Sequence, residues 1–224
     1  METATEACSV ALWIDGDVRE RYQIAPRRHA ELVLPWADAL LADAGIAKSQ
    51  LDAIAVGRGP GAFTGVRLAI ALAQGLALAL DRPVVPVSTL AALAMQCDGQ
   101  RILAAIDARM GEIYFGTFAR DADGLVAAID AERLARPDAV VLHQDGGWDG
   151  VGTGFAADNG AMMKTLGASM SRCNANALPH AADTARLAAR AFAHGEAVAP
   201  ELIEPAYLRN KVALTLAEQQ TARR

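Results

Sequence analysis

The histidines of this sequence do not form a metal-binding or catalytic motif. His29, His143, His180 and His194 are widely separated, with neither an HxxxH nor an HExxH pattern, and no cysteine lies near them in sequence. Structural and catalytic zinc sites gather their ligands from such short spacings. A Gly-x-Ser-x-Gly nucleophile turn is also missing from the sequence. The side chains that most often do chemistry therefore give no support to a metal-dependent or serine hydrolase.

Two glycine-rich turns follow short apolar runs, where backbone N–H groups could hold a phosphate. The turn over residues 57–62 fits the spacing of a dinucleotide-binding turn superficially, but Pro60 has no N–H to donate to a phosphate. A dinucleotide site also needs an acidic residue at the end of the next strand, whereas Asp81 lies before that strand. In the second turn, Gly152, Thr153 and Gly154 lead into a helix and are candidate nucleotide-binding residues. Weak nucleotide binding there remains an expectation.

The elements that would position these turns alternate between strands and helices. The apolar patterns predict strands at 9–14, 18–24, 54–56, 84–87, 102–106, 112–118, 125–129 and 140–142, followed by a loop at 145–150. They predict helices at 30–44, from residue 63 or 64 to 80, at 90–95 and at 181–193. Strand, helix, strand, helix in this order indicates an α/β fold with parallel pairing.

The pattern that begins near residue 100 repeats the opening pattern, which indicates an internal duplication. We therefore expect two lobes, at residues 1–100 and 101–205, and a tail at 206–224 that packs back on the first lobe.

The predicted helix at 64–80 is apolar on nearly all sides, with Arg67 and Gln74 as the clear exceptions. A surface helix normally shows a polar face, so this one must be covered on both sides. Ala69, Ala73 and Ala77 form a strip of small residues that would let a second helix approach closely. Burial in its own domain and burial against a partner protein both remain open. The helix is too short and interrupted to predict a membrane span.

Composition excludes several classes of function. The 224 residues carry a formal net charge of -5, and aromatic residues make up only 5%. An acidic chain with few aromatic rings is unlike a protein that binds nucleic acid alone. Cys8, Cys97 and Cys173 are odd in number and widely spaced, which indicates reduced thiols in a cytoplasmic protein. The first residues lack the basic and apolar regions of a signal peptide.

Four segments together resemble the TsaB (YeaZ) family nearly end to end: residues 2–12, 57–67, 105–114 and 204–209. The string Gly-Pro-Gly-x-Phe-Thr-Gly-x-Arg within the second segment is the most specific of them. The resemblance implies a duplicated actin-like fold of the sugar kinase and Hsp70 type. It also implies a non-catalytic subunit of the complex that makes N6-threonylcarbamoyladenosine at position 37 of tRNA.

The same resemblance implies the partners and the absence of a required cofactor. The chain would pair with the metal-bearing paralogue TsaD, meet the ATPase TsaE through the complex, form a homodimer when alone, and meet tRNA only indirectly. TsaD carries a His-x-x-x-His metal motif at the places that Thr89 and Leu93 occupy here. Neither side chain can replace an imidazole ligand, so no metal site is expected.

The surface that would pair with TsaD is placed by the resemblance on the two helices at 30–44 and 64–80. The residues expected to form it are Leu32, Trp36, Leu40, Phe63, Arg67, Ile70, Ala73 and Ala77. A charged residue at Ala73 is then expected to abolish pairing and leave the fold intact.

The resemblance also implies an apolar first strand ahead of Glu2, where this sequence has only Met1. Adding about five or six apolar residues there, the usual length of a strand, is expected to raise stability.

Two other functions remain open. A small-molecule kinase or hydrolase of the same fold would use Asp107 as a base and the turn at Gly152 as a phosphate loop. A self-contained tRNA-binding module conflicts with the acidic charge.

Overall fold

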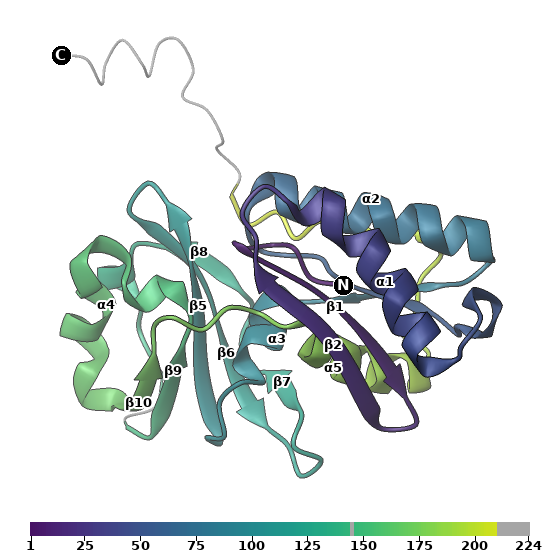
Figure 1. The fold of residues 1–224 in the computed structure, drawn as a ribbon. Helices are drawn as coiled ribbons and strands as arrows, with labels where there is room; N and C mark the ends of the chain where they lie inside the picture. Colours follow the sequence, from purple (N-terminus) through teal and green to yellow (C-terminus); the bar gives the residue numbers. More distant parts are fainter. Residues whose placement is uncertain (144–145, 210–224) are drawn as a thin grey trace, which may run out of the picture.

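The computed structural model describes residues 1–143 and 146–209, which form two α/β lobes side by side (Figure 1). The helices are α1 (His29–Ala44), α2 (Phe63–Leu80), α3 (Thr89–Ala94), α4 (Ala157–Leu166) and α5 (Ala181–Ala193). The strands are β1 (Ala7–Ile14), β2 (Asp17–Ile24), β3 (Ile54–Gly57), β4 (Val84–Val87), β5 (Arg101–Arg109), β6 (Glu112–Arg120), β7 (Val126–Ala128), β8 (Arg133–Ala135), β9 (Trp148–Val151) and β10 (Met170–Asn174).

The first lobe opens with a hairpin made of the first two predicted strands. β1 and β2 pair antiparallel, and the turn between them places Asp15 and Gly16 at φ values of 50° and 99°. An Asp-Gly pair adopts these left-handed conformations readily, which is why it closes a two-residue hairpin. After the hairpin, α1 ends as predicted at Gly45, whose φ of 68° stops the helix.

The amino-terminal residues lie between the two strand pairs of this lobe. Glu2 forms an antiparallel bridge with Ser9 of β1, and the N–H of Gly57 in β3 donates to the carbonyl of Met1 over 3.0 Å. β3 in turn pairs with β4 in parallel. The order across the lobe is therefore β4, β3, residues 1–4, β1 and β2.

The second lobe repeats this order with a complete central strand. Its sheet runs β10, β9, β5, β6 and β7, with β8 also paired to β6. β5 is parallel to β9 and antiparallel to β6, as residues 1–4 are to β3 and β1. The structure thus confirms the predicted duplication, and it shows that nine-residue β5 has only residues 1–4 as its counterpart in the first lobe.

One predicted strand is wrong. Residues 140–142 are not a strand, and Val141 there is 73% exposed. The strand at this place is β9, which overlaps the segment predicted to be a loop. β9 contains a glycine and Asp149 and is buried along its whole length, so it shows no alternation of apolar and polar residues. Asp149 lies within it because Arg172 and the N–H of Gly99 satisfy the carboxylate.

The two lobes share a core around α3 and α5. Leu90 and Leu93 of α3 pack there with Ile102 of β5, Phe118 of β6 and Leu187 of α5. Ser88 caps α3 by accepting a hydrogen bond from the N–H of Ala91.

The chain returns to the first lobe well before residue 205, so the lobes are not two consecutive blocks. α5 packs on β1, β3 and β4, and the N–H groups of Ala181 and Ala182 donate to the side chains of Ser9 and Glu20. Val198 then bridges to Val84 of β4. Of the expected tail, residues 210–224 lie outside the described part of the chain.

Candidate docking surface and interlobe loops

α2 turns one face to the core of its own lobe and the other face outward. Its buried residues are Val66, Ala69, Ile70, Ala73 and Ala77. Ala69, Ala73 and Ala77 have no exposed surface at all, and they pack against strand residues such as Val56 and Val84. The predicted small-residue strip is therefore inside the lobe, and the expectation that a charge at Ala73 would spare the fold is corrected.

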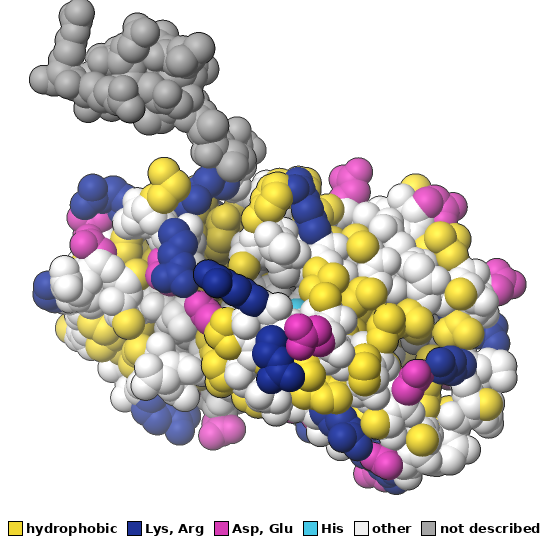
Figure 2. All heavy atoms as spheres, turned by 45° about the horizontal axis from the view of Figure 1, so that its top comes forward, with side chains coloured by type: hydrophobic (Ala, Val, Ile, Leu, Met, Phe, Trp, Pro, Cys, Tyr) yellow, Lys and Arg dark blue, Asp and Glu magenta, His cyan; other side chains and the backbone are white. Residues whose placement is uncertain are grey.

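The outward face of α2 is made of other residues, nearly all apolar or small. Its exposed members are Phe63, Thr64, Arg67, Ala71, Gly75, Leu78 and Ala79. Phe63 is 56% exposed and Leu78 is 66% exposed. We call this set the outward α2 face. Figure 2 shows hydrophobic side chains gathered over the first lobe on the side of α1 and α2.

The only charged residue of α2 marks which face is outward. Arg67 is exposed, and steps of about one, two and three turns from it reach Ala71, Gly75 and Leu78. This phase was readable in the sequence, and it would have identified the outward α2 face where the strip of alanines pointed inward.

α1 lies beside α2 on the same side of the lobe (Figure 1). Of its predicted interface residues, Leu40 is buried in the core, whereas Leu32 and Trp36 are half-buried against it. Leu34, which the prediction did not include, is 40% exposed. The structure therefore places Phe63 and Arg67 on the surface, Leu32 and Trp36 at its border, and Leu40, Ile70, Ala73 and Ala77 within the core.

By length and composition alone α2 could cross a membrane, since its 18 residues have a mean hydropathy of 1.7. Only 28% of the helix is buried in the structure. Helices that pack one face on a soluble core pass the same test, and α2 does pack one face on β3. The outward α2 face is an apolar patch of the kind that marks a protein interface.

Arg67 contacts two aromatic rings, one from its own helix and one from near the carboxyl end of the described chain. Its guanidinium carbon lies 3.4 Å from the ring centroid of Phe63 and 5.4 Å from that of Tyr207. Its Nε and Nη2 both donate to the Tyr207 hydroxyl, over 3.0 and 2.6 Å. The specific Phe-Thr-Gly-x-Arg string and the carboxyl-terminal motif thus meet in one cluster at the start of α2.

The glycine-rich turn after β3 packs against the chain's own amino terminus. A Cβ added to Gly57 would lie 2.0 Å from Oε2 of Glu2, and one added to Gly65 would lie 2.0 Å from the carbonyl oxygen of Thr3. The N–H of Ala62 donates to the carbonyl of Ala4 over 2.7 Å. These two glycines leave room for the Glu2 side chain and for the Thr3 backbone, so contacts within the protein account for them.

Glu2 is a buried carboxyl group with protein partners. It is 1% exposed, it accepts from the N–H of Ala4 over 2.8 Å, and it accepts from the Thr89 hydroxyl over 3.0 Å. Burial raises the pKa of Glu2, because a charged carboxylate loses its hydration there. Burial likewise lowers the pKa of the Met1 amino group to about 6.

The places that would carry a metal motif are fully buried. Thr89 and Leu93 have no exposed surface, and Thr89 binds Glu2. Within residues 1–143 and 146–209, no group of three or more His, Cys, Asp or Glu residues could hold a metal ion.

The candidate nucleotide loop lies against β5. A Cβ on Gly152 would lie 2.3 Å from the Ala105 carbonyl oxygen, and one on Gly154 would lie 2.6 Å from the Ala105 Cβ. The Thr153 hydroxyl accepts from the N–H of Asp107 over 3.0 Å. These contacts give the loop a packing role, and nucleotide binding there remains a prediction.

The carboxylate of Asp107, the candidate base of a kinase, is already bound by Arg109. Its carboxylate accepts from the N–H of Arg109 over 2.7 Å and from the Arg109 guanidinium over 3.1 Å. A general base must be free to accept a proton from substrate, which this pairing opposes.

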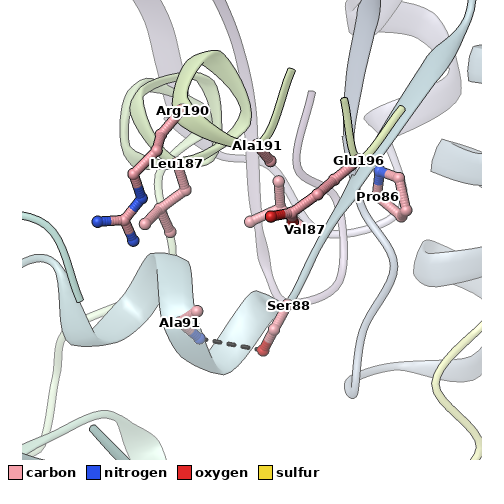
Figure 3. Close-up of a pocket in the computed structure, with 8 residues that line it drawn as sticks. All are labelled: Pro86, Val87, Ser88, Ala91, Leu187, Arg190, Ala191 and Glu196. Carbon is pink, nitrogen blue, oxygen red and sulfur yellow. Dashed lines mark hydrogen bonds between the residues drawn. The ribbon is translucent and has the colours of Figure 1, made fainter. Parts of the chain in front are cut away.

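A cavity of about 210 Å³ lies between the start of α3 and the end of α5 (Figure 3). It is smaller than typical ligand pockets. Arg190, one of its polar lining residues, already donates to Asp121 and to the carbonyl of Val126. Ser88, another, accepts from the N–H of Ala91. We therefore interpret this cavity as a gap in packing.

Comparison with known proteins agrees with this fold. The family model described as "TsaD: tRNA N6-adenosine threonylcarbamoyltransferase" matches residues 22–215. The tRNA threonylcarbamoyladenosine biosynthesis protein TsaB of Escherichia coli is 43% identical over 95% of this chain and 94% of that protein. TsaB of Haemophilus influenzae is 38% identical over 95% of this chain and 93% of that protein.

Two solved structures from Pseudomonas aeruginosa are similar throughout. One is described as an uncharacterized protein with similarity to peptidase YEAZ, with a TM-score of 0.86, 44% identity and coverage of 93% of this chain and 97% of that one. The other, YeaZ, has a TM-score of 0.85 at 44% identity, with coverage of 92% of this chain and 97% of that one. Together these matches give the actin-like α/β fold that the sequence resemblance implied. The chain belongs to the TsaB family.

Proposed function

We propose that this chain is a non-catalytic subunit in the biosynthesis of threonylcarbamoyladenosine on tRNA, and that it pairs with a TsaD-type paralogue through α1 and the outward α2 face. Its relatives are named as tRNA threonylcarbamoyladenosine biosynthesis proteins. The observation that carries the pairing is the outward α2 face, on which Phe63 and Leu78 are more than half exposed.

The character of this face supports a protein partner. Ala71 and Gly75 have small side chains that permit a helix of the partner to approach closely, and Phe63, Leu78 and Leu34 supply apolar area around them. Arg67 is held rigidly between aromatic rings. Aromatic residues and arginine are the types that most often dominate interface energetics.

The proposed complex is cytoplasmic, needs no cofactor on this chain, and meets tRNA and a TsaE-type ATPase through the TsaD-type subunit. In the absence of that subunit, the same face forms a homodimer, because an apolar patch left in water favours association.

The test is the mass of the complex formed on mixing the chain with its TsaD-type partner, with and without Ala71→Glu. We expect the wild type to form a heterodimer and Ala71→Glu to lose it, because a charge would be buried without a partner in the interface. Ala193→Glu, at an exposed alanine of α5, is the matched control and should pair normally. Normal pairing by a folded Ala71→Glu protein would place the interface elsewhere.

A small-molecule kinase or hydrolase of the same fold is the alternative. Asp107 is its only candidate base, and the contacts of Asp107 with Arg109 oppose that role. None of the hydrogen bonds made by histidines in the described residues joins a hydroxyl or a thiol. ATPase, phosphotransfer and peptidase assays on the purified chain are expected to show no turnover, and activity lost on Asp107→Asn would favour the alternative.

A further inference from the structure

The turn between β5 and β6 has an unusual backbone. Arg109, Met110 and Gly111 have φ values of 63°, 60° and 72°, so two residues with side chains adopt the left-handed conformation. Such conformations are unfavourable for residues other than glycine, and they persist where surrounding contacts hold them. The contacts that hold this turn should therefore be identifiable.

The contacts come from Arg209, about a hundred residues away in sequence. Its Nη2 donates to the carbonyl of Ala108 over 3.1 Å, to the carbonyl of Arg109 over 3.4 Å, and to Oε2 of Glu112 over 2.7 Å. The Arg209 side chain is only 18% exposed. One guanidinium thus binds both carbonyls and the carboxylate around the strained turn of the second lobe.

The residues just before Arg209 are anchored in the first lobe. Ile203 is 5% exposed and belongs to the core of that lobe. The N–H of Ala206 donates to the carbonyl of Arg58 over 2.9 Å, and the Tyr207 hydroxyl accepts two hydrogen bonds from Arg67. The segment Ile203–Arg209 therefore reaches from the core of one lobe to a turn of the other.

The segment Ile203–Arg209 lies on the side of the molecule opposite the core that the two lobes share. Figure 1 shows the end of the described chain passing between the lobes on one side, with α3 and α5 on the other. α3 and α5 form the continuous packing between lobes and would act as the hinge of any relative rotation. Contacts between the lobes on the side far from this hinge resist a rotation of one lobe against the other most strongly.

The other ion pair between the lobes at this turn is weaker. Arg109 Nη2 lies 3.1 Å from Oε1 of Glu6, but these side chains are 74% and 47% exposed. Exposed pairs of this kind contribute little. Arg209 is therefore the principal polar link on this side of the described structure.

We propose that Ile203–Arg209 is a clasp that fixes the angle between the two lobes, with Arg209 as the residue that closes it. Lysine at this position would keep the charge but ends in a shorter, strongly hydrated ammonium group, so it would hold these three acceptors less well than Arg209 does. This inference is separate from the proposed pairing, and it holds for the chain alone.

The test measures the distance between the lobes in the full chain by pulsed electron spin resonance. Spin labels are placed at Ala47→Cys in the first lobe and Lys164→Cys in the second, both at exposed positions, with Cys97 and Cys173 changed to serine. We expect Arg209→Met to broaden the distance distribution toward longer values. Arg136→Met is the matched control and should leave it unchanged, because Arg136 pairs with Asp138 in its own lobe.

Hydrogen exchange gives a second readout at the turn itself. In Arg209→Met the amides of residues 109–111 should exchange at least about threefold faster, because local opening becomes easier. If Arg209→Met does not fold, judged by circular dichroism, Arg209→Lys replaces it and is expected to show the same changes to a smaller extent. A folded variant at Arg209 with the wild-type distance distribution overturns the proposal.

Discussion

Ala73 shows how strongly a single position depends on which face of its helix it occupies. It is fully buried between α2 and the strands beneath it, so a charge there would be placed in the core of the first lobe. We predict that Ala73→Glu unfolds the first lobe, at a cost of several kcal/mol for a buried unpaired charge. Circular dichroism and thermal unfolding give the measurement.

Ala71→Glu is the matched control two residues away on the exposed side of α2, and it should keep a midpoint within a few degrees of wild type. A cooperative wild-type transition in Ala73→Glu would contradict the burial of Ala73.

Gly57 is a second position where the surrounding atoms restrict the size of the side chain. The Cβ of an alanine would overlap the buried carboxyl of Glu2. We predict that Gly57→Ala lowers the free energy of unfolding by about 1–3 kcal/mol, the usual cost of an overpacked site. Chemical denaturation measures it.

The control for Gly57→Ala is Gly75→Ala in α2, where an added Cβ meets nothing within 4 Å. This change should be stabilising by about 0.5–1 kcal/mol, because alanine suits a helix better than glycine. Equal effects of the two substitutions would count against the close contact with Glu2.

At the scale of elements, the start of α5 is held by the hairpin of the first lobe. Glu20 of β2 accepts from the N–H of Ala182 over 2.9 Å and binds Nδ1 of His180 over 2.8 Å. The His180 ring also stacks on Tyr22, with centroids 4.1 Å apart. The hydrogen bond to Glu20 raises the pKa of His180 above its usual value of 6.5.

This raised pKa predicts a pH dependence of stability. The folded state favours charged His180, so the stabilisation is fully present below about pH 6.5 and is lost as pH rises through the raised pKa. We expect a loss of about 1.5 kcal/mol, the lower end of the range for a hydrogen bond to a charged group, because His180 is only half-buried. Denaturation at pH 5.5 to 8.5 should show that Glu20→Gln flattens this dependence.

Glu196 offers a matched control, since it lies 3.9 Å from His194 and both side chains are 65% exposed. Glu196→Gln should leave the pH profile of the wild type unchanged. If Glu20→Gln behaves in the same way, the His180 pair does not contribute to the pH dependence.

The central position of the first-lobe sheet gives a further prediction at this scale. Residues 1–4 occupy the place that β5 fills in the second lobe, and the Met1 amino group donates to the carbonyl of Ala55 as a strand N–H would. An added strand of about five or six apolar residues would pair with β1 and β3 and replace a buried amino group by a peptide N–H. We predict a higher thermal midpoint for the lengthened chain.

An extension of equal length made of Gly and Ser is the control for this prediction, since it adds backbone but little apolar area. Equal midpoints for the apolar extension and for the unextended chain would contradict the prediction.

At the scale of the whole molecule, the family model described as "TsaD: tRNA N6-adenosine threonylcarbamoyltransferase" matches most of the chain, and two positions of α3 bear on metal binding. Thr89 and Leu93 are buried where the resemblance places two metal-binding histidines. We predict that protein purified without a tag contains less than about one tenth of a metal equivalent per chain, because neither side chain binds metal. Elemental analysis measures it. One tightly held zinc or iron per chain would contradict the prediction.

Much of this molecule was determined by local sequence. The Asp-Gly step fixed the β1–β2 hairpin, Gly45 ended α1, and the apolar runs located β3, α2, β4 and β5 in order. The repeat of that order predicted the duplicated lobes. Turn chemistry and helix ends depend on residues a few positions apart, so they can be read without the fold.

The tertiary structure decided the features that depend on distant contacts. An almost uniformly apolar helix carries little periodic signal beyond its single charged residue, Arg67, and packing decided that Ala73 is inside and Ala71 outside. β9 was missed because a strand buried on both faces has no alternation. The return of α5 to the first lobe and the binding of Arg209 to the β5–β6 turn join residues about a hundred or more positions apart. No local pattern specifies such contacts, because they form only when the whole chain packs.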